Sequence, residues 1–401
     1  MINLNQFIAS HVTKRNTSIF QEDIERNREQ LSSQIKDKSI LVIGGAGTIG
    51  SSYIRSILPF RPRSLVVVDV NENGLTELTR DLRSSTRFVP QDYLTYPMNY
   101  ADAVFEKMFR SRRGFDIVAN FSAHKHVRSE KDVYSVEALL ENNVLRARHL
   151  LELLREFKPQ HFFCVSTDKA TNPVNIMGGS KKIMEDMIMA YSREFPVTTA
   201  RFANVAFSNG SLPAGFLDRI AKKQPISAPY DVTRYFVSPD ESGQICMLAC
   251  MLGRSGEIYF PKLSKEQMMT FSTMATDLLH EMGYHVLECQ SQQQAIERAQ
   301  ALEHGSLDYP VYYSQSDTSG EKPYEEFYTD GETVDLTRHC SLGVVTSVTP
   351  RPMDEIDIFF KQLRALFADN HTSKGQVVEA MRGFLKNFEH IETGLNLDSK
   401  M

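Results

Sequence analysis

The chain has 401 residues, of which 41 % are apolar and 24 % are charged, the balance of a soluble globular protein with one large α/β domain or two domains. A net charge of −5 provides no general attraction to nucleic acid or to an anionic membrane. No apolar run is long enough to span a bilayer, and the first residues lack the charged and apolar regions of a signal peptide.

The cysteines are odd in number and scattered, which is not the pattern of a disulfide framework. Two of them share a helix face, but no histidine or further cysteine completes a metal site beside them. We therefore expect buried thiols in a reducing cytoplasm and no bound metal. The cysteines are Cys164, Cys246, Cys250, Cys289 and Cys340.

Residues 1–37 are predicted to form a helical N-terminal arm. The stretch 19–35 has helical character, with Glu, Arg and Gln dominating and few apolar anchors. Such a helix buries little by itself, so we expect it to pack on the body of the protein or on a neighbouring subunit.

From Lys38 onward, short β-branched runs alternate with helical stretches. This alternation indicates βαβ units, whose right-handed crossovers place helices on both faces of a parallel sheet. We therefore predict an α/β fold of the Rossmann type, with a doubly wound parallel sheet, over residues 38–205. The predicted strands are residues 39–43, 64–70, 87–90, 116–121, 161–166 and 197–202.

After residue 205 the rhythm becomes less regular. We predict a smaller, mixed substrate-binding region over 206–340, interleaved with the core, and a C-terminal helical extension over 341–401. Residues 289–318 are rich in Gln and Ser, and only one helical stretch is predicted there. The predicted helices of both regions are residues 241–252, 271–282, 293–303, 354–367 and 375–388.

The segment 43–50 follows the first strand, opens a helix and carries the glycine pattern of a dinucleotide-binding loop. It fits Gly-x-Gly-x-x-Gly from Gly45 or Gly-x-x-Gly-x-x-Gly from Gly44. Glycine is needed because the turn has unusual dihedral angles and because a pyrophosphate must approach the backbone and the helix N-terminus closely. The predicted cofactor-binding residues of this loop are Gly44, Gly47, Thr48, Ile49 and Gly50.

Four further residues are predicted to bind the same cofactor. Asp69 ends the second strand, where a carboxylate accepts hydrogen bonds from an adenosine ribose and repels a 2′-phosphate, which favours NAD over NADP. Asp92, placed just after the third strand, is a candidate acceptor for the adenine amine, although a loop-capping role is equally consistent. Ser122 and Ala123 follow the fourth strand and are small enough for the backbone to lie close to a dinucleotide.

The fifth strand ends in a cluster of reactive side chains. Ser166-Thr167-Asp168-Lys169 brings hydroxyls, an acid and an amine to the carboxyl end of an apolar strand, and Lys181 begins the next helix. Ligands bind at the carboxyl ends of strands in open parallel sheets, so we expect substrate to meet cofactor here.

These segments resemble the extended short-chain dehydrogenase/reductase superfamily. Within it they resemble a soluble short form of the nucleotide-sugar 4,6-dehydratases that act on UDP-N-acetylglucosamine. The resemblance runs in the family's order over residues 39–335, and the Asp-Lys pair joined to Thr-Asn-Pro is specific to this branch. The matching segments are residues 44–50, 122–127, 141–144, 166–173, 177–181, 201–205, 233–236 and 320–326.

The resemblance implies bound NAD and conversion of a UDP- or GDP-linked N-acetylhexosamine to a 4-keto-6-deoxy sugar for surface glycans. Oxidation at C4 acidifies the C5 hydrogen, water leaves across C5 and C6, and the hydride returns to C6. Carried onto this chain, Lys169 is the C5 base, Asp168 is the acid for the departing 6-hydroxyl, and Thr167 binds the 4-hydroxyl. We expect burial and the nearby Lys181 to lower the pKa of Lys169, and Asp168 to oppose them.

One residue departs from the pattern of the superfamily. Met177 stands where most members have a tyrosine that takes the alcohol proton, and a thioether is a poor acceptor. The C4 base is therefore left open between Asp168, Thr167 through water and Lys181 through water. Lys181 is still expected to bind the nicotinamide ribose.

On the substrate side, Asn204 and Arg234 match positions that hold the nucleotide diphosphate in the resembled family, and the planar fork of arginine suits that dianion. A structural role is the alternative for both. Lys125, in the run after the fourth strand, is also predicted to contact substrate. Asn143 is expected to be a scaffold residue, and residues 320–326 are expected to lie near the substrate nucleotide.

Two other functions fit the same sequence. An NAD-dependent nucleotide-sugar epimerase uses the same transient 4-ketone, but it returns hydride to C4 and needs no acid for a leaving group at C6. A dinucleotide-binding scaffold that has lost catalysis is the second alternative, with Met177 as decay.

The resemblance further implies a cytoplasmic homo-oligomer. Members of the superfamily commonly dimerise through two helices, predicted here over residues 136–157 and 181–195. Their apolar side chains can equally face their own sheet. The apolar positions are Leu139, Leu150, Met184, Met187 and Ile188.

Overall fold

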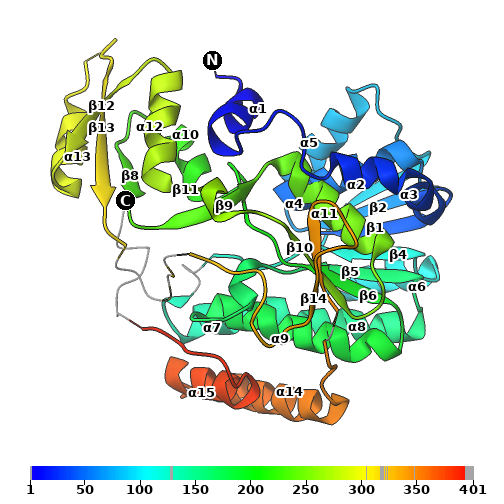
Figure 1. Ribbon diagram of the computed structural model, residues 1–401. Helices are drawn as coiled ribbons and strands as arrows, with labels where there is room; N and C mark the ends of the chain where they lie inside the picture. The colour runs from blue at the N-terminus through cyan, green and yellow to red at the C-terminus, as the bar shows by residue number, and fades with distance from the viewer. Residues whose placement is uncertain are drawn as a thin grey trace.

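The computed structural model describes residues 2–126, 130–303, 305–316, 320, 322, 324–346 and 348–392. Its centre is a nine-stranded sheet in the order β14-β15-β10-β6-β5-β4-β1-β2-β3 (Figure 1). The strands from β10 to β3 run parallel, and β15 and β14 are antiparallel additions at one edge. The bounds are β1 Ser39–Ile43, β2 Ser64–Asp69, β3 Asp92–Pro97, β4 Ile117–Asn120, β5 His161–Val165, β6 Val197–Ala200, β10 Glu257–Pro261, β14 Val334–Asp335 and β15 Leu342–Val345.

This strand order confirms the predicted doubly wound α/β fold. From β1 the chain moves outward to β2 and β3, and then returns to β4, β5 and β6 on the other side of β1. The direction of winding therefore reverses between β1 and β4. Ligands bind at the carboxyl ends of the strands at such a reversal, and the predicted glycine loop follows β1 at this point.

Helices cover both faces of the sheet, which explains why the strand sequences are almost continuously apolar. α4 and α11 pack on each other over one face, while α7, α8 and α9 lie over the opposite face (Figure 1). A π-helical turn, Glu141–Leu145, joins α7 and α8 into one continuous helical segment. The bounds are α2 Gln21–Arg26, α3 Arg28–Ile35, α4 Thr48–Ile57, α5 Glu72–Arg83, α6 Ala103–Ser111, α7 Val133–Leu140, α8 Arg146–Glu156, α9 Ile176–Ala190 and α11 Pro239–Leu252.

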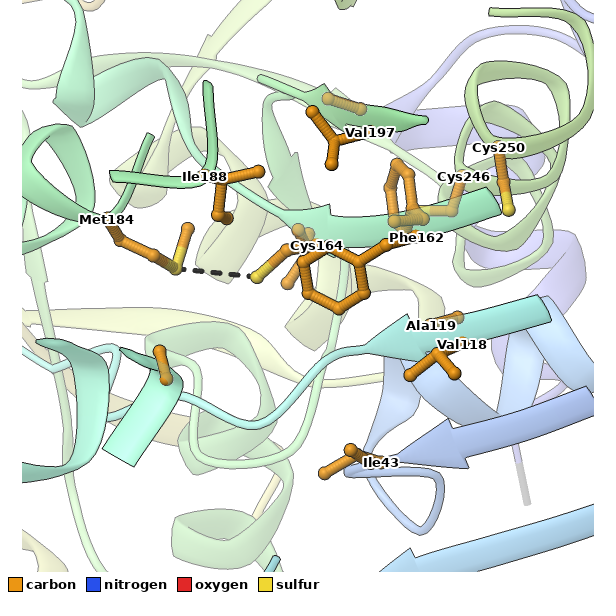
Figure 2. Close-up of a cluster of buried hydrophobic side chains, with 14 of the residues drawn as sticks. Ile43, Val118, Ala119, Phe162, Cys164, Met184, Ile188, Val197, Cys246 and Cys250 are labelled. Carbon is orange, nitrogen blue, oxygen red and sulfur yellow. Dashed lines mark hydrogen bonds between the residues drawn. The ribbon is translucent and has the colours of Figure 1, made fainter. Parts of the chain in front are cut away.

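The middle of the sheet forms an apolar core around β5. In Figure 2, Cys164 on β5 and Met184 on α9 point toward one another, and the Cys164 thiol donates a hydrogen bond to Met184 Sδ at 3.4 Å. Burial raises the pKa of Cys164 to about 11, so this thiol stays protonated. All five cysteines are free, and all but the half-buried Cys340 are buried, as expected from the sequence.

A second, smaller lobe has its own apolar core. One three-stranded sheet, β12-β13-β8, is parallel, and the other has the order β11-β9-β7. β13 lies in the range 289–318, where we predicted only one helix, and β12 lies just before it, where we predicted no element. β12 buries only its last residue, so its sequence lacks the apolar signal of a strand. The bounds are β7 Asn204–Val205, β8 Ile226–Pro229, β9 Thr233–Val237, β11 Met268–Thr270, β12 His285–Cys289, β13 Asp308–Ser314, α10 Leu212–Ala221, α12 Phe271–Glu281 and α13 Gln292–Gln300.

The N-terminal arm packs on the chain itself, in two parts. α1 (Leu4–Phe7) inserts Phe7 into the core of the second lobe. α2 and α3, which replace the single predicted helix, lie on the central domain and bury Leu31 and Ile35 completely. The buried Asp23 accepts hydrogen bonds from the backbone N–H groups of Cys340 and Ser341 at 2.7 and 2.8 Å. Of the two expectations for the arm, packing on the body is the one that the structure shows.

The C-terminal extension forms a third layer. α14 (Met353–Ala368) and α15 (Lys374–Phe384) lie beneath α7, α8 and α9 (Figure 1), and Met381 of α15 packs on Gly179 of α9. The extension also contains β15, within a range where we predicted only helices. The apolar positions predicted to mediate dimerisation are buried inside the chain, so the predicted homo-oligomer stays a prediction. They are Leu139, Leu150, Met184, Met187 and Ile188.

Candidate active site

The glycine loop after β1 is shaped to receive a phosphate group. Gly44 has a φ of 76°, and a Cβ added there would lie 2.6 Å from the backbone N of Ser122. A Cβ at Gly50 would lie 2.3 Å from Gly44 O, so the loop and the first turn of α4 touch. Gly47 begins α4 and has no side chain to cap it, which leaves the first N–H groups of the helix available for an anion.

Asp69 lies where the sequence predicts it, at the carboxyl end of β2 beside the glycine loop. Its Oδ2 accepts a hydrogen bond from Ala46 N and its Oδ1 accepts one from Asn71 N, each at 2.9 Å. These two hydrogen bonds hold the side chain of the half-buried Asp69 against the loop. Its predicted ribose contact stays a prediction.

The predicted cofactor contact of Asp92 is wrong. The third strand begins at Asp92 instead of ending before it, and Asp92 pairs with Ser64, the first residue of β2. Asp92 therefore lies at the amino edge of the sheet, opposite the glycine loop. Arg112 Nη1 donates a hydrogen bond to Asp92 Oδ2 at 2.9 Å, and this hydrogen bond lowers the pKa of Asp92.

The segment after β4 lies against the glycine loop at Ser122. The cofactor contacts predicted for Ser122 and Ala123 stay predictions. Asn143 connects this segment to α9. Its Oδ1 accepts from His124 N at 2.8 Å, and its Nδ2 donates to His124 O at 2.9 Å and to Ser180 Oγ at 3.0 Å. These contacts give Asn143 the scaffold position that we expected.

The predicted acid and amine meet at the carboxyl end of β5, in a 3-10 turn over Asp168–Ala170. Asp168 Oδ1 accepts hydrogen bonds from Thr167 Oγ1 at 2.8 Å, from Lys169 N at 2.9 Å and from Lys169 Nζ at 3.1 Å. Asp168 is almost fully buried, whereas the Lys169 side chain is 20 % exposed. Asp168 thus holds the side chain of the neighbouring Lys169 in a fixed orientation.

Glu325 also belongs to this cluster, although no role was predicted for it. Its Oε1 lies 3.8 Å from Lys169 Nζ and 3.9 Å from Arg234 Nη2. Burial alone would lower the pKa of Lys169, but the attraction of Asp168 and then of Glu325 exceeds that effect, so the pKa is raised. Burial lowers this pKa and Asp168 opposes it, as expected, but the cation that lowers it is Arg234 and not Lys181. The only sequence signal for Glu325 was its place in the matching segment 320–326.

Lys181 is the amine whose pKa is lowered, because burial disfavours its charge. Its Nζ donates a hydrogen bond to Val165 O at 3.0 Å, at the end of β5. Met177 is buried in the first turn of α9, and Glu130 accepts hydrogen bonds from the N–H groups of Ile176 and Met177 at 3.0 and 2.7 Å. Glu130, which the sequence analysis missed, thus caps the helix that carries Met177 and Lys181.

The C-terminal segment after α15 lies beside the same helix start. Glu389 N donates to Pro173 O at 3.2 Å, and Ile391 N donates to Val174 O at 3.0 Å. Lys374 Nζ donates to Glu130 O at 2.6 Å. The extension therefore holds the segment between Lys169 and α9 from outside.

The three residues that are predicted to contact the substrate lie in two separate parts of the structure. Asn204 Oδ1 accepts from Lys169 Nζ at 3.5 Å, and the buried Arg234 donates to the backbone oxygens of Thr233 and Lys322, each at 2.9 Å. Lys125 is exposed, and its Nζ donates to Asn209 O at 2.7 Å. Asn204 and Arg234 thus join the cluster around Lys169, whereas Lys125 lies at the loop before α10. All three roles stay predictions.

A buried ion-pair network lies next to the cluster around Lys169. Arg201, at the end of β6, is completely buried and donates to both carboxylate oxygens of Glu185 and of Glu332. Ser166, next to Thr167, donates to Glu185 Oε1 at 2.5 Å. The network therefore ties β5, β6, α9 and the loop before β14 together. Arg201 stood in a matching segment without an assigned role.

The sequence matches the family model described as polysaccharide biosynthesis protein over residues 40–346. An uncharacterized membrane protein of Methanocaldococcus jannaschii is 31 % identical over 241 residues, which are 59 % of this chain and 69 % of that protein. The probable polysaccharide biosynthesis protein EpsC of Bacillus subtilis is 28 % identical over 64 % of this chain. The match spans only 42 % of EpsC.

Solved structures share the fold. Pen from Bacillus thuringiensis superposes with a TM-score of 0.62 at 20 % identity, over 79 % of this chain and 90 % of that one. The dTDP-glucose 4,6-dehydratase DesIV of Streptomyces venezuelae, solved with NAD bound, gives a TM-score of 0.53 at 21 % identity, over 68 % and 87 %. A UDP-N-acetylglucosamine 4-epimerase of Methanobrevibacter ruminantium gives 0.54 at 15 % identity, over 74 % and 91 %.

None of the helices in the described ranges is long and apolar enough to cross a lipid bilayer. The family match covers the central sheet, the glycine loop and the cluster around Lys169. It confirms the resemblance to extended short-chain dehydrogenases/reductases. The chain belongs to the polysaccharide biosynthesis protein family within that superfamily.

Proposed function

We propose that this protein is an NAD-dependent 4,6-dehydratase of a nucleotide-linked N-acetylhexosamine, with UDP-N-acetylglucosamine as the first candidate substrate. The observation that supports this most strongly is the contact of Asp168 with Lys169 at the carboxyl end of β5, one strand away from β4 and two from β1 with its glycine loop. An acid and an amine in contact suit a reaction that removes a proton at C5 and protonates a leaving group at C6.

The residues around the glycine loop fit NAD. Gly44 and Gly50 leave no room for side chains between the loop, α4 and the segment after β4. The uncapped start of α4 suits a pyrophosphate, and Asp69 suits a ribose hydroxyl. When bound, NAD would accept the C4 hydride and return it at C6.

In the proposed reaction, Lys169 removes the C5 proton and Asp168 protonates the departing 6-hydroxyl. Thr167 donates to Asp168 in this structure and would turn to the 4-hydroxyl of the substrate. Lys181 is a candidate for the C4 proton through a water, because its lowered pKa makes the neutral amine more accessible than that of Lys169. Arg234 and Asn204 would hold the diphosphate.

A nucleotide-sugar epimerase is the second candidate. The solved epimerase of Methanobrevibacter ruminantium shares the fold. Both reactions begin with removal of hydride from C4, and they diverge only at C5 and C6. The Asp168–Lys169 contact favours dehydration, because an epimerase has no leaving group at C6 to protonate.

Mass spectrometry of UDP- and GDP-N-acetylglucosamine, incubated separately with the purified protein in deuterated water without added cofactor, tests the proposal. We expect one of them to give a product lighter by one water and labelled with deuterium at C5. A 4-epimer of unchanged mass, separated from the substrate by chromatography before the mass measurement, would establish the alternative. An unaltered sugar with both donors would contradict the proposed substrates, and release of NAD on denaturation would then distinguish an enzyme from a scaffold without cofactor.

Replacing Asp69 with asparagine is expected to weaken NAD binding by about tenfold, the effect of losing roughly 1.4 kcal/mol of charge-assisted hydrogen bonding. Asp92→Asn is the matched control and is expected to leave NAD affinity unchanged, because Asp92 lies at the opposite edge of the sheet. Titration of NAD into protein freed of cofactor measures both constants. Equal losses in the two variants would contradict the placement of the cofactor along the glycine loop.

A further inference from the structure

We propose that Glu325 takes the proton of Lys169 and holds it while the neutral amine of Lys169 removes the C5 proton of the sugar. This inference rests on the proposed dehydration and answers a problem that the structure raises for it. Lys169 is surrounded by carboxylates that favour its charged form, whereas a base must be neutral. Some group in the cluster has to receive its proton.

The position of Glu325 suits that role. The residue is only 6 % exposed, and its Oε1 lies 3.8 Å from Lys169 Nζ. A movement of about 1 Å at the flexible end of the lysine would bring the two atoms within hydrogen-bond distance. Glu325 Oε2 is buried and accepts no hydrogen bond from any residue that the structure describes. A buried carboxylate oxygen without a donor is costly, and protonation of the carboxyl removes that cost.

Burial and four nearby charges set the pKa of Glu325. Burial raises its pKa, Lys169 and Arg234 lower it, Asp168 raises it, and Lys322, at 3.9 Å from Oε2, lowers it, with a net rise. One anion and three cations thus face this carboxyl, and burial outweighs them. If the substrate diphosphate engages Arg234, one of those cations is neutralised. The pKa of Glu325 then rises further, so substrate binding itself favours transfer of the proton.

Asp168 is the competing acceptor. It already contacts Lys169 Nζ, but its Oδ1 also accepts from Thr167 Oγ1 and Lys169 N. The hydrogen bond from Lys169 N persists after the Lys169 proton leaves, and it stabilises the carboxylate form. No described residue donates a hydrogen bond to Glu325 Oε2, so Glu325 is the better place for the proton.

The proton count of the step balances. The Nζ–H bond of Lys169 breaks, and its proton bonds to a carboxylate oxygen of Glu325, which leaves a neutral amine and a neutral carboxyl. The amine then takes the C5 proton, and the electron pair left at C5 expels the 6-hydroxyl. The 6-hydroxyl departs as water with the proton that Asp168 received from the 4-hydroxyl during oxidation at C4, directly or through water and Lys181. Return of the C5 proton from Lys169, and of the stored proton from Glu325 to Lys169, restores the cluster for the next turnover.

The test uses exchange of the C5 hydrogen in deuterated water, with the UDP-linked 4-keto-6-deoxy-N-acetylhexosamine supplied directly. This partial reaction requires no hydride transfer, so it reports on the C5 base even if C4 oxidation fails. In the wild type, Lys169 and Glu325 share one proton, and we expect an exchange rate that is constant over about three pH units. In Glu325→Gln the lysine must lose its proton to solvent, so the rate at pH 7 should fall by about 10-fold to 100-fold and rise about tenfold per pH unit.

Two variants serve as controls. Glu297→Gln alters an exposed carboxylate on α13, which accepts from Gln293 Nε2 at 3.0 Å, and it should keep the flat wild-type profile. Glu325→Asp keeps a carboxyl that can hold a proton, so it should restore the flat profile at a lower rate. Equal melting temperatures for all variants would exclude loss of folding as the cause.

The remaining outcomes are distinct. A flat profile at the wild-type rate in Glu325→Gln would overturn the inference and assign the proton to Asp168. Faster exchange in Glu325→Gln at neutral pH would also overturn it, because Glu325 would then do no more than attract the lysine charge. Absence of exchange in the wild type would contradict the proposed function itself.

Discussion

Lys169→Met is expected to lower turnover of the nucleotide sugar by about 10²-fold to 10⁴-fold, the usual contribution of a general base. Lys169 is bound to Asp168 at the end of β5 and makes no contact with the glycine loop among the described residues. Bound NAD should therefore remain. If C4 oxidation survives in this variant, reduced cofactor accumulates, because the hydride acceptor at C6 never forms.

Turnover is measured by mass spectrometry, and cofactor reduction by the absorbance of reduced nicotinamide in the same sample. Lys107→Met on α6 is a suitable control, since that lysine is exposed and should be dispensable. Full activity in Lys169→Met would contradict the assignment of Lys169 as the C5 base. Loss of the cofactor together with activity would indicate a structural effect instead.

Arg201→Met is expected to destabilise the fold by about 3–5 kcal/mol, the cost of leaving one side of a buried ion pair without its partner. Arg201 is completely buried, and Glu185 beside it is 1 % exposed. Methionine fills much of the same volume but donates no hydrogen bonds. The variant therefore leaves two carboxylates, of Glu185 and Glu332, facing an apolar side chain.

The destabilisation should depend on pH. Burial by itself raises the pKa of Glu185, but Arg201, Lys182 and Ser166 together exceed that effect and lower it. A lowered pKa in the folded state contributes stability above the pKa of the unfolded chain, about 4.3, and that stability is lost as the pH falls. Without Arg201, burial dominates and the pKa of Glu185 should be raised. Acidification then costs the variant less than the wild type, and the difference between them should narrow from pH 7 to about pH 5.

Urea unfolding followed by circular dichroism at both pH values measures this difference. Arg155→Met is the matched control, because Arg155 pairs with Glu152 and Glu194 on the surface, where its side chain is 44 % exposed. Exposed pairs contribute less than about 1 kcal/mol. A difference in stability that is the same at both pH values would show that lost packing, not the buried carboxylates, causes the effect.

The alternation of strands and helices, the glycine loop and Asp69 could be predicted because each depends on residues close together in the sequence. Apolar strands, helix starts and the glycine spacing are local signals, and the parallel sheet then brings the ends of β1, β4 and β5 to one edge. The Asp168–Lys169 contact was likewise predictable, since the two residues are adjacent. Even the buried state of Cys164 followed from the apolar strand that contains it.

The predictions that failed concerned features that depend on strand register and on long-range packing. Asp92 was misplaced because β3 is an edge strand with alternating exposure, so its apolar signal is weak and its start was predicted too early. β15 was missed because it pairs with β10, whose residues lie about eighty positions earlier in the chain. No local pattern states which segment will complete the edge of a sheet.

The sequence by itself determined the class of fold, the position of the phosphate loop and the identity of the acid and amine at the end of β5. Their protonation states depend on the tertiary structure. It placed Glu325 and Arg234, from distant parts of the chain, beside Lys169, and it buried Lys181 without a carboxylate at hydrogen-bond distance from its amine among the described residues. The physical reason is that a pKa depends on the charges within a few ångströms and on the exclusion of water. Both are properties of the packed molecule, so the charge of Lys169 could not be foreseen from its neighbours in sequence.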